Sequence, residues 1–205
     1  MAANYQVIHR GELLEKASKA LILLHGRGGS ARDIINLARE FCDDSFHIAA
    51  PEAPNHSWYP QSFLAEEKYN EPWLSQSVQA VKNLIDEIAA SIPLHQIFLM
   101  GFSQGACLAL ETSARHAAKY GGVVAFTGGL IGSQLNVAKY KGEFGGTVVF
   151  IGNGDKDPHV SLARSQESKE IMEKMGAQVT LKVYPGRPHL VSQEEIDWVK
   201  THMFA

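Results

Sequence analysis

The stretch that decides the fold is Gln96-Ile97-Phe98-Leu99-Met100-Gly101-Phe102-Ser103-Gln104-Gly105. Its first part is strongly hydrophobic, which predicts a central buried strand over residues 96–102. An alanine-rich segment follows and predicts a helix to about Lys119, stopped by the Gly121-Gly122 pair. Because the strand leads directly into the helix, we expect a very sharp turn with Ser103 at its tip.

The remainder of the chain alternates short apolar runs with helical patterns, which is typical of a parallel sheet with crossover helices. The sequence therefore predicts one α/β domain over residues 1–205, with a mostly parallel central sheet, helices on both faces and no separate lid domain. Residues 51–72 are rich in Pro, Asn and aromatics and predict a long irregular loop, a kind that usually serves a function. Further strands are expected at 20–24, 46–50, 123–126, 147–151 and 179–184, and helices at about 31–41, 73–91, 161–175 and 193–203.

Composition excludes several classes of protein. A chain of 205 residues is long enough to bury a full core. Its 19 Lys+Arg against 22 Asp+Glu give a net charge of −3, and the sequence shows no basic patch of the kind typical of nucleic-acid or membrane-surface binding. Cys42 and Cys107 form no disulfide framework, which favours a reducing compartment. Residues 1–11 lack the apolar core of a signal peptide, and no run is long enough for a membrane span. We expect a cytoplasmic protein.

Gly101-Phe102-Ser103-Gln104-Gly105 fits the pattern G-x-S-x-G, whose spacing has a mechanical cause. Strand and helix backbones pass too close at such a turn for a Cβ two residues on either side of the serine. A serine hydroxyl becomes a good nucleophile only when a histidine accepts its proton and a carboxylate holds that histidine. Since the carboxyl ends of parallel strands meet at one edge, we expect both partners in loops after later strands.

Two later loops offer these partners. His189 follows the strand at 179–184 in a loop fixed by Gly and Pro, and it is the predicted base. Asp155 and Asp157 both follow the strand at 147–151 and compete for the role of the acid. Pro158 restricts the backbone of Asp157 and favours it, which leaves Asp155 to order its loop through local hydrogen bonds.

A tetrahedral intermediate needs two backbone donors at its oxyanion. We expect the N–H of Gln104 and, from the glycine loop after residues 20–24, the N–H of Arg27. The Arg27 side chain is either solvated or placed at the entrance of the site. Aromatic residues of the 51–72 loop are candidates for loop anchors and for a substrate-binding wall at once: Trp58, Tyr59 and Phe63.

Four segments together resemble the phospholipase/carboxylesterase family of α/β-hydrolases, which includes acyl-protein thioesterases: His25-Gly26-Arg27-Gly28-Gly29, Gly101 to Gly105, Asp157-Pro158-His159-Val160 and Tyr184 to His189. The resemblance runs from about residue 21 to the end. It implies the α/β-hydrolase fold and hydrolysis of carboxylic esters without a cofactor, with Ser103 as nucleophile, Asp157 as acid and His189 as base. No metal is expected either.

The match also departs from the family pattern. Ser161 stands where the family usually has proline after the acid loop, and the aromatic loop resembles a bacterial carboxylesterase branch more than the branch acting on lipidated proteins. We therefore expect small to medium acyl esters as substrates, with acyl-protein thioesterase or lysophospholipase activity as alternatives. The acyl chain length, a homodimer and a lid motion of residues 51–72 stay open.

Three other classes of protein compete with an esterase. The segment from Gly26 to Ala31 fits the dinucleotide-binding pattern G-x-G-x-x-A, with Glu52 as the acidic residue, although Glu52 comes later than usual. Asp155, Asp157 and His159 have alternating spacing that could serve a metal, but no second cluster completes the ligand set. A non-catalytic ligand-binding protein on the same scaffold is a third alternative, which a complete set of nucleophile, base and acid disfavours.

Overall fold

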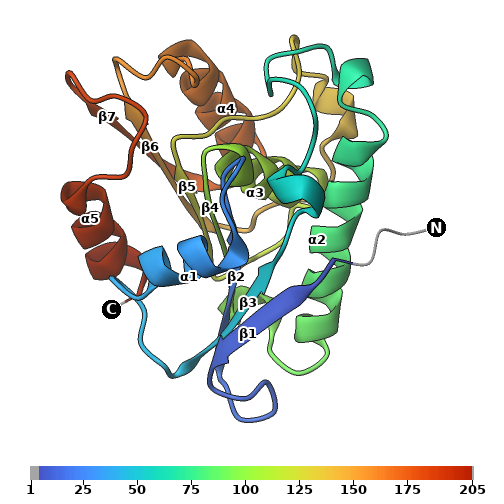
Figure 1. The fold of residues 1–205 in the computed structure, drawn as a ribbon, viewed down its shortest axis with the longest axis vertical. Coiled ribbons are helices and arrows are strands. Elements are labelled where there is room, and N and C mark those ends of the chain that lie inside the picture. The colour runs from blue at the N-terminus through green and yellow to red at the C-terminus, as the bar shows by residue number, and fades with distance from the viewer. Residues whose placement is uncertain (1–4, 205) are drawn as a thin grey trace.

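The computed structural model describes residues 5–204, so residues 1–4 and 205 of the predicted domain lie outside it. A seven-stranded sheet has the order β1-β3-β2-β4-β5-β6-β7, in which only β1 runs antiparallel to its neighbour (Figure 1). The strands are Val7–Gly11 (β1), Lys19–Leu24 (β2), Phe46–Pro51 (β3), Ile97–Phe102 (β4), Gly122–Phe126 (β5), Val148–Gly154 (β6) and Gln178–Tyr184 (β7).

Within the described part of the chain, five α-helices cover the two faces of this sheet. Alternate residues of each inner strand point to opposite faces: Leu21 and Leu23 pack in one core cluster with α1 and α5, whereas Ile22 and Leu24 pack in the other with α2, α3 and α4. The predicted mostly parallel sheet with helices on both faces is confirmed. The helices are Ala31–Ala38 (α1), Trp73–Ala89 (α2), Gln104–Arg115 (α3), Leu162–Lys174 (α4) and Gln193–Met203 (α5).

Strand β4 is central, with β2 and β5 paired to it in parallel. The segment between β3 and α2 is irregular, as its composition predicts, and contains two short 3-10 helices, Pro54–His56 and Glu67–Tyr69. This segment follows β3 and is joined to the loop after β2 and to the start of α3, where the Gly28 amide donates to His56 O and Gln104 Nε2 donates to Tyr59 O.

Three details of the chain differ from what the sequence predicts. Helix α3 ends at Arg115, four residues before the expected end. Gly121 and Gly122 do not stop this helix: a Cβ on Gly121 would lie 2.6 Å from the Phe98 ring, so the glycines are needed where β5 packs beside β4. Strand β1 was not expected at all, because its five residues contain one short apolar pair and none of its residues is fully buried.

Candidate active site

Ser103 lies at the turn between β4 and α3 in a strained backbone conformation, with φ 56° and ψ −116°. A Cβ on Gly101 would collide with the Gly105 carbonyl, and a Cβ on Gly105 would collide with the Leu24 carbonyl. The steric reason given for the G-x-S-x-G spacing is therefore confirmed. The amide of Ser103 donates to Phe126 O over 2.9 Å, which fixes the turn against β5.

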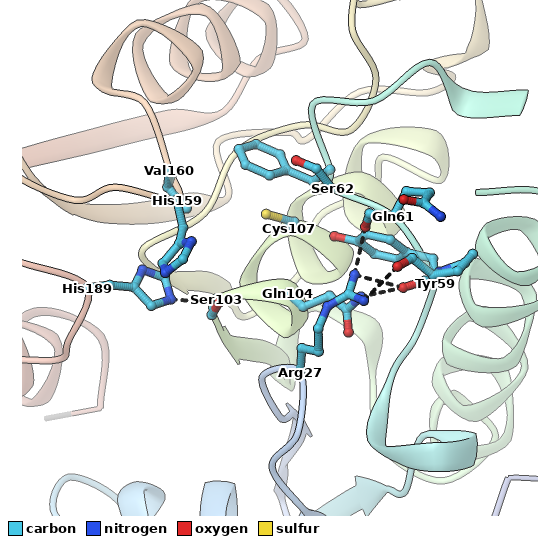
Figure 2. A pocket seen from close by; sticks show the side chains of 12 residues that line it. Arg27, Tyr59, Gln61, Ser62, Ser103, Gln104, Cys107, His159, Val160 and His189 are labelled. Carbon is cyan, nitrogen blue, oxygen red and sulfur yellow. Dashed lines mark hydrogen bonds between the residues drawn. The ribbon is translucent and has the colours of Figure 1, made fainter. Parts of the chain in front are cut away.

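The structure brings Ser103, His189 and Asp157 into one hydrogen-bonded row. His189 Nε2 lies 2.8 Å from Ser103 Oγ, and His189 Nδ1 lies 2.7 Å from Asp157 Oδ2. Figure 2 shows His189 reaching Ser103 from the side of the cavity that also carries His159. The imidazole is thus placed to accept the Ser103 proton at Nε2 while Nδ1–H donates to Asp157.

Asp157 is held as a charged acceptor. Its other oxygen, Oδ1, accepts hydrogen bonds from the amides of His159 (2.8 Å) and Val160 (3.0 Å). Burial by itself would raise the pKa of Asp157, but the hydrogen bonds from His189 and from these two amides outweigh it and lower the pKa below its usual range. The carboxylate consequently stays ionised beside the histidine.

Asp155 takes a different position. Its Oδ1 accepts a hydrogen bond of 2.6 Å from the amide of Gly186, in the loop that carries His189. Asp155 does accept a hydrogen bond from a backbone amide, as expected. The bond joins the loop of Asp155 to the loop of His189, whereas we expected a bond within the loop of Asp155. The geometry places Asp157 at the histidine and Asp155 at the base of the histidine's loop.

The two amides expected at the oxyanion belong to residues that line the same cavity as Ser103. Gln104 is the first residue of α3, where a helix leaves its amides without intrahelical acceptors. In the glycine loop, the amides of Gly28 and Gly29 donate to His56 O and Gly26 O. The Arg27 amide remains as the loop's candidate donor.

The side chains of Arg27 and Gln104 both hold the aromatic loop. Arg27 donates to the carbonyls of Tyr59 (2.9 Å), Pro60 (2.7 Å) and Gln61 (2.6 Å), and Gln104 Nε2 donates to the same Tyr59 oxygen over 2.8 Å (Figure 2). The Arg27 guanidinium therefore fixes the wall of the site. This role lies between the two that the sequence left open, a solvated side chain and a side chain at the entrance.

A cavity of about 440 Å³ opens beside Ser103. Tyr59 and Phe63 line it as predicted, but Trp58 does not. The Trp58 side chain is 1% exposed and its indole N–H donates to His25 O over 2.8 Å, so it anchors the loop from behind. The lining residues are Arg27, Tyr59, Pro60, Gln61, Ser62, Phe63, Ser103, Gln104, Cys107, His159, Val160 and His189.

Some lining residues were not predicted as such. Cys107 lies one helical turn after Ser103, and this i, i+4 spacing could have placed it in the site. Burial raises the pKa of the Cys107 thiol to about 12, so it lines the cavity as a neutral group. Gln61 and Ser62 lie in the irregular loop, where no periodic pattern indicates which side chains face inward.

This geometry disfavours a dinucleotide site and offers little support for a metal site. Glu52 Oε2 accepts a hydrogen bond of 2.9 Å from the Ala31 amide, and Ser30 and Asp33 form a capping box at the same end of α1. Two carboxylates thus occupy the helix end where a pyrophosphate would have to bind. Within residues 5–204, no group of three or more His, Cys, Asp and Glu side chains could hold a metal ion.

Comparison with known proteins decides the family. The family model described as Phospholipase/Carboxylesterase matches residues 4–205. The chain belongs to the phospholipase/carboxylesterase family. It is therefore a carboxylesterase-family hydrolase with the α/β-hydrolase fold.

Solved and curated members of the family are similar over nearly the whole chain. A phospholipase/carboxylesterase from Dyadobacter fermentans is 49% identical with a TM-score of 0.96, covering 98% of this chain and 97% of that one. Acyl-protein thioesterase 1 of Debaryomyces hansenii is 30% identical over 88% of each chain. A carboxylesterase from Bacillus cereus, 24% identical with a TM-score of 0.79, shares the fold over 97% of this chain and 93% of its own. None of the helices described in residues 5–204 is both long and apolar enough to cross a bilayer.

Proposed function

We propose that the protein hydrolyses carboxylic esters with Ser103 as nucleophile, His189 as general base and Asp157 as the acid that orients His189. The observation that carries this proposal is the continuous row of hydrogen bonds from Asp157 through His189 to Ser103. His189 lies 86 positions after Ser103 and 32 positions after Asp157 in the sequence. Side chains from the ends of three strands meet in this order, and two of them, Ser103 and His189, line the cavity, which is the arrangement that acyl transfer requires.

In the first step, Ser103 Oγ forms a bond to the carbonyl carbon while its proton moves to His189 Nε2. The intermediate collapses as the bond to the leaving oxygen breaks, and His189 returns the proton to that oxygen, so an alcohol departs. Water then attacks the acyl-enzyme by the same route, releasing the carboxylic acid and restoring Ser103. Asp157 keeps its charge throughout and stabilises the imidazolium.

The oxyanion of each tetrahedral intermediate is stabilised, in this proposal, by the amides of Arg27 and Gln104. The Gln104 amide points from the first turn of α3, where the helix dipole adds positive potential. The side chains of both residues are committed to Tyr59 O, which supports a rigid placement of their backbones.

The cavity supports small to medium acyl groups as the substrate class. Its volume of about 440 Å³ and its mixed lining of Tyr59, Phe63 and Val160 with Gln61 and Ser62 suit a short acyl chain. Thioesters can follow the same chemistry, and the resemblance to an acyl-protein thioesterase makes them the second candidate. We further propose that residues 1–205 form one domain and that the protein acts in the cytoplasm, which the free thiols of Cys42 and Cys107 support.

The test is hydrolysis of p-nitrophenyl esters and matched thioesters of increasing acyl length by the wild-type protein and by Ser103→Ala. We expect turnover of the short esters by the wild type, with Ser103→Ala slower by on the order of 10³-fold or more. Retention of more than a tenth of the activity in folded Ser103→Ala would rule out Ser103 as nucleophile.

A further inference from the structure

A second cavity, of about 300 Å³, lies on the α1 side of the glycine loop that follows β2. We call it the α1 groove. Its walls are the glycine loop after β2, the side of α1, and the residues that flank Ser103 and His189 in the sequence. The lining residues are His25, Gly26, Arg27, Gly29, Asp33, Ile34, Leu37, Phe102 and Val191.

The α1 groove and the cavity of the proposed acyl site are neighbours. Arg27 lines both of them. The Phe102 ring packs against Gly26 on one side and has its centroid 5.3 Å from that of the His189 ring on the other. The groove thus begins between the glycine loop and the loop of His189. Figure 2 shows Arg27 and His189 on opposite sides of Ser103.

This position matches a requirement of the proposed reaction, on which the inference rests. A tetrahedral carbon bound to Ser103 Oγ carries three further substituents: the oxyanion, the acyl chain and the leaving oxygen. The oxyanion faces the amides of Arg27 and Gln104, and the acyl chain fits the cavity beside Tyr59 and Phe63. The leaving oxygen must lie within reach of the proton on His189 Nε2. The α1 groove adjoins that position, because its lining residue Phe102 packs against the His189 ring.

We propose that the α1 groove binds the alcohol portion of the ester and that this alcohol is apolar and uncharged. Ile34, Leu37, Phe102 and Val191 supply an aliphatic and aromatic surface. The one carboxylate in the lining belongs to Asp33, which is exposed at the rim and fixed by hydrogen bonds from Ser30.

The charges around the groove disfavour an anionic leaving group such as a glycerophosphate. Asp33 would repel it, and the Arg27 guanidinium, the nearest cation in the lining, is turned toward the carbonyls of Tyr59, Pro60 and Gln61. The groove therefore selects simple alkyl or aryl esters over lysophospholipids.

The experiment alters the size of the groove at Leu37, a half-buried residue of α1 outside the proposed triad. Leu37→Trp should fill the groove and Leu37→Ala should enlarge it. The exposed residue Leu13, in the loop between β1 and β2, gives a matched control as Leu13→Trp. Each protein is assayed on acetate esters of ethanol, butanol and benzyl alcohol, and on p-nitrophenyl esters of increasing acyl length.

For Leu37→Trp we expect kcat/KM on benzyl acetate to fall at least tenfold relative to ethyl acetate, since a change of a single methylene group in an apolar pocket is already worth about 10- to 200-fold. Leu37→Ala should shift preference toward the larger alcohol. The acyl-length preference and the deacylation rate, measured by pre-steady-state burst, should keep their wild-type values because the alcohol has left before deacylation begins. Leu13→Trp should behave as the wild type on all esters.

Two results would overturn the inference: a folded Leu37 variant with wild-type alcohol preference, or a variant whose acyl-length preference changes instead. Should Leu37→Trp not fold, Leu37→Ala decides between the same outcomes. Failure here is distinct from failure of the proposed function, because hydrolysis that depends on Ser103 would persist in the first case and be absent in the second.

Discussion

Arg27 Nη2 donates a hydrogen bond of 2.9 Å to the carbonyl of Tyr59, which joins the loop after β2 to the wall of the acyl cavity across 32 positions of sequence. Gln104, directly after Ser103, reaches the same oxygen over 2.8 Å. The two residues with the proposed oxyanion amides therefore share one anchor on the aromatic loop. A displacement of this loop should displace the oxyanion donors as well.

Arg27→Met should lower kcat by about tenfold to a hundredfold for all esters, even though the substitution keeps the backbone amide of residue 27. Three charge-assisted hydrogen bonds to the loop are lost, and the donors lose their fixed geometry. Steady-state kinetics on acetyl and butyl esters check this. Arg10→Met, which removes an exposed arginine of β1, serves as the control; equal activity of the two variants would contradict the role given to Arg27.

The two aspartates should respond differently to the same substitution. Asp157→Asn places a donor where His189 Nδ1–H needs an acceptor, and turnover should fall by up to about 10⁴-fold with the protein still folded. Asp155→Asn should keep most of the activity, because the amide oxygen of asparagine can still accept the Gly186 N–H. Both variants are assayed with one ester at one pH after circular dichroism. If Asp155→Asn is the inactive variant, the acid lies two residues upstream of our assignment.

Asp157 should also contribute to the acid sensitivity of the fold. Its pKa is lowered in the folded state, so its contribution to stability is fully present above the ordinary carboxyl pKa of about 4 and is lost as pH falls through the lowered value. The difference in free energy of unfolding between the wild type and Asp157→Asn should shrink below pH 4. Urea titrations at pH 7, 5, 4 and 3 measure it, and a difference that grows on acidification would show the opposite shift.

The aromatic loop contains residues of two kinds, which paired variants should separate. Phe63 lines the cavity, so Phe63→Leu should shift the ratio of kcat/KM between longer and shorter acyl esters severalfold. Trp58 anchors the loop through His25 O, so Trp58→Phe should lower Tm by a few degrees without changing that ratio. The chain-length series and thermal unfolding together check this. If Trp58→Phe changes the acyl preference and Phe63→Leu does not, Trp58 contacts the acyl chain and our assignment is wrong.

The central part of the site could be predicted because its signals are local. Ser103 follows from glycine spacing at a strand-to-helix turn, and His189 from a loop after a late strand at the edge where parallel strands converge. Gly101 and Gly105 lie where neighbouring backbone segments approach too closely for a Cβ, which is the steric reason that their spacing suggested.

The contacts that were not predicted depend on distant parts of the chain. Arg27 finds its acceptors in the irregular segment 51–72, and Trp58 is turned inward by a carbonyl 33 positions away. No periodic pattern in that segment indicates which side chains face the cavity. Strand β1 was missed for a related reason, since pairing with β3 stabilises it more than its own short apolar pair does.

Covalent labelling of the nucleophile tests the central claim most directly. The wild type and Ser103→Ala are incubated with a fluorophosphonate, which forms a stable adduct with an activated serine, and intact mass and peptide mapping locate the adduct. We predict one adduct per wild-type chain, on Ser103, with activity lost in proportion to labelling, and no adduct on Ser103→Ala. Labelling of another residue, or inhibition that persists in an active Ser103→Ala protein, would contradict the account.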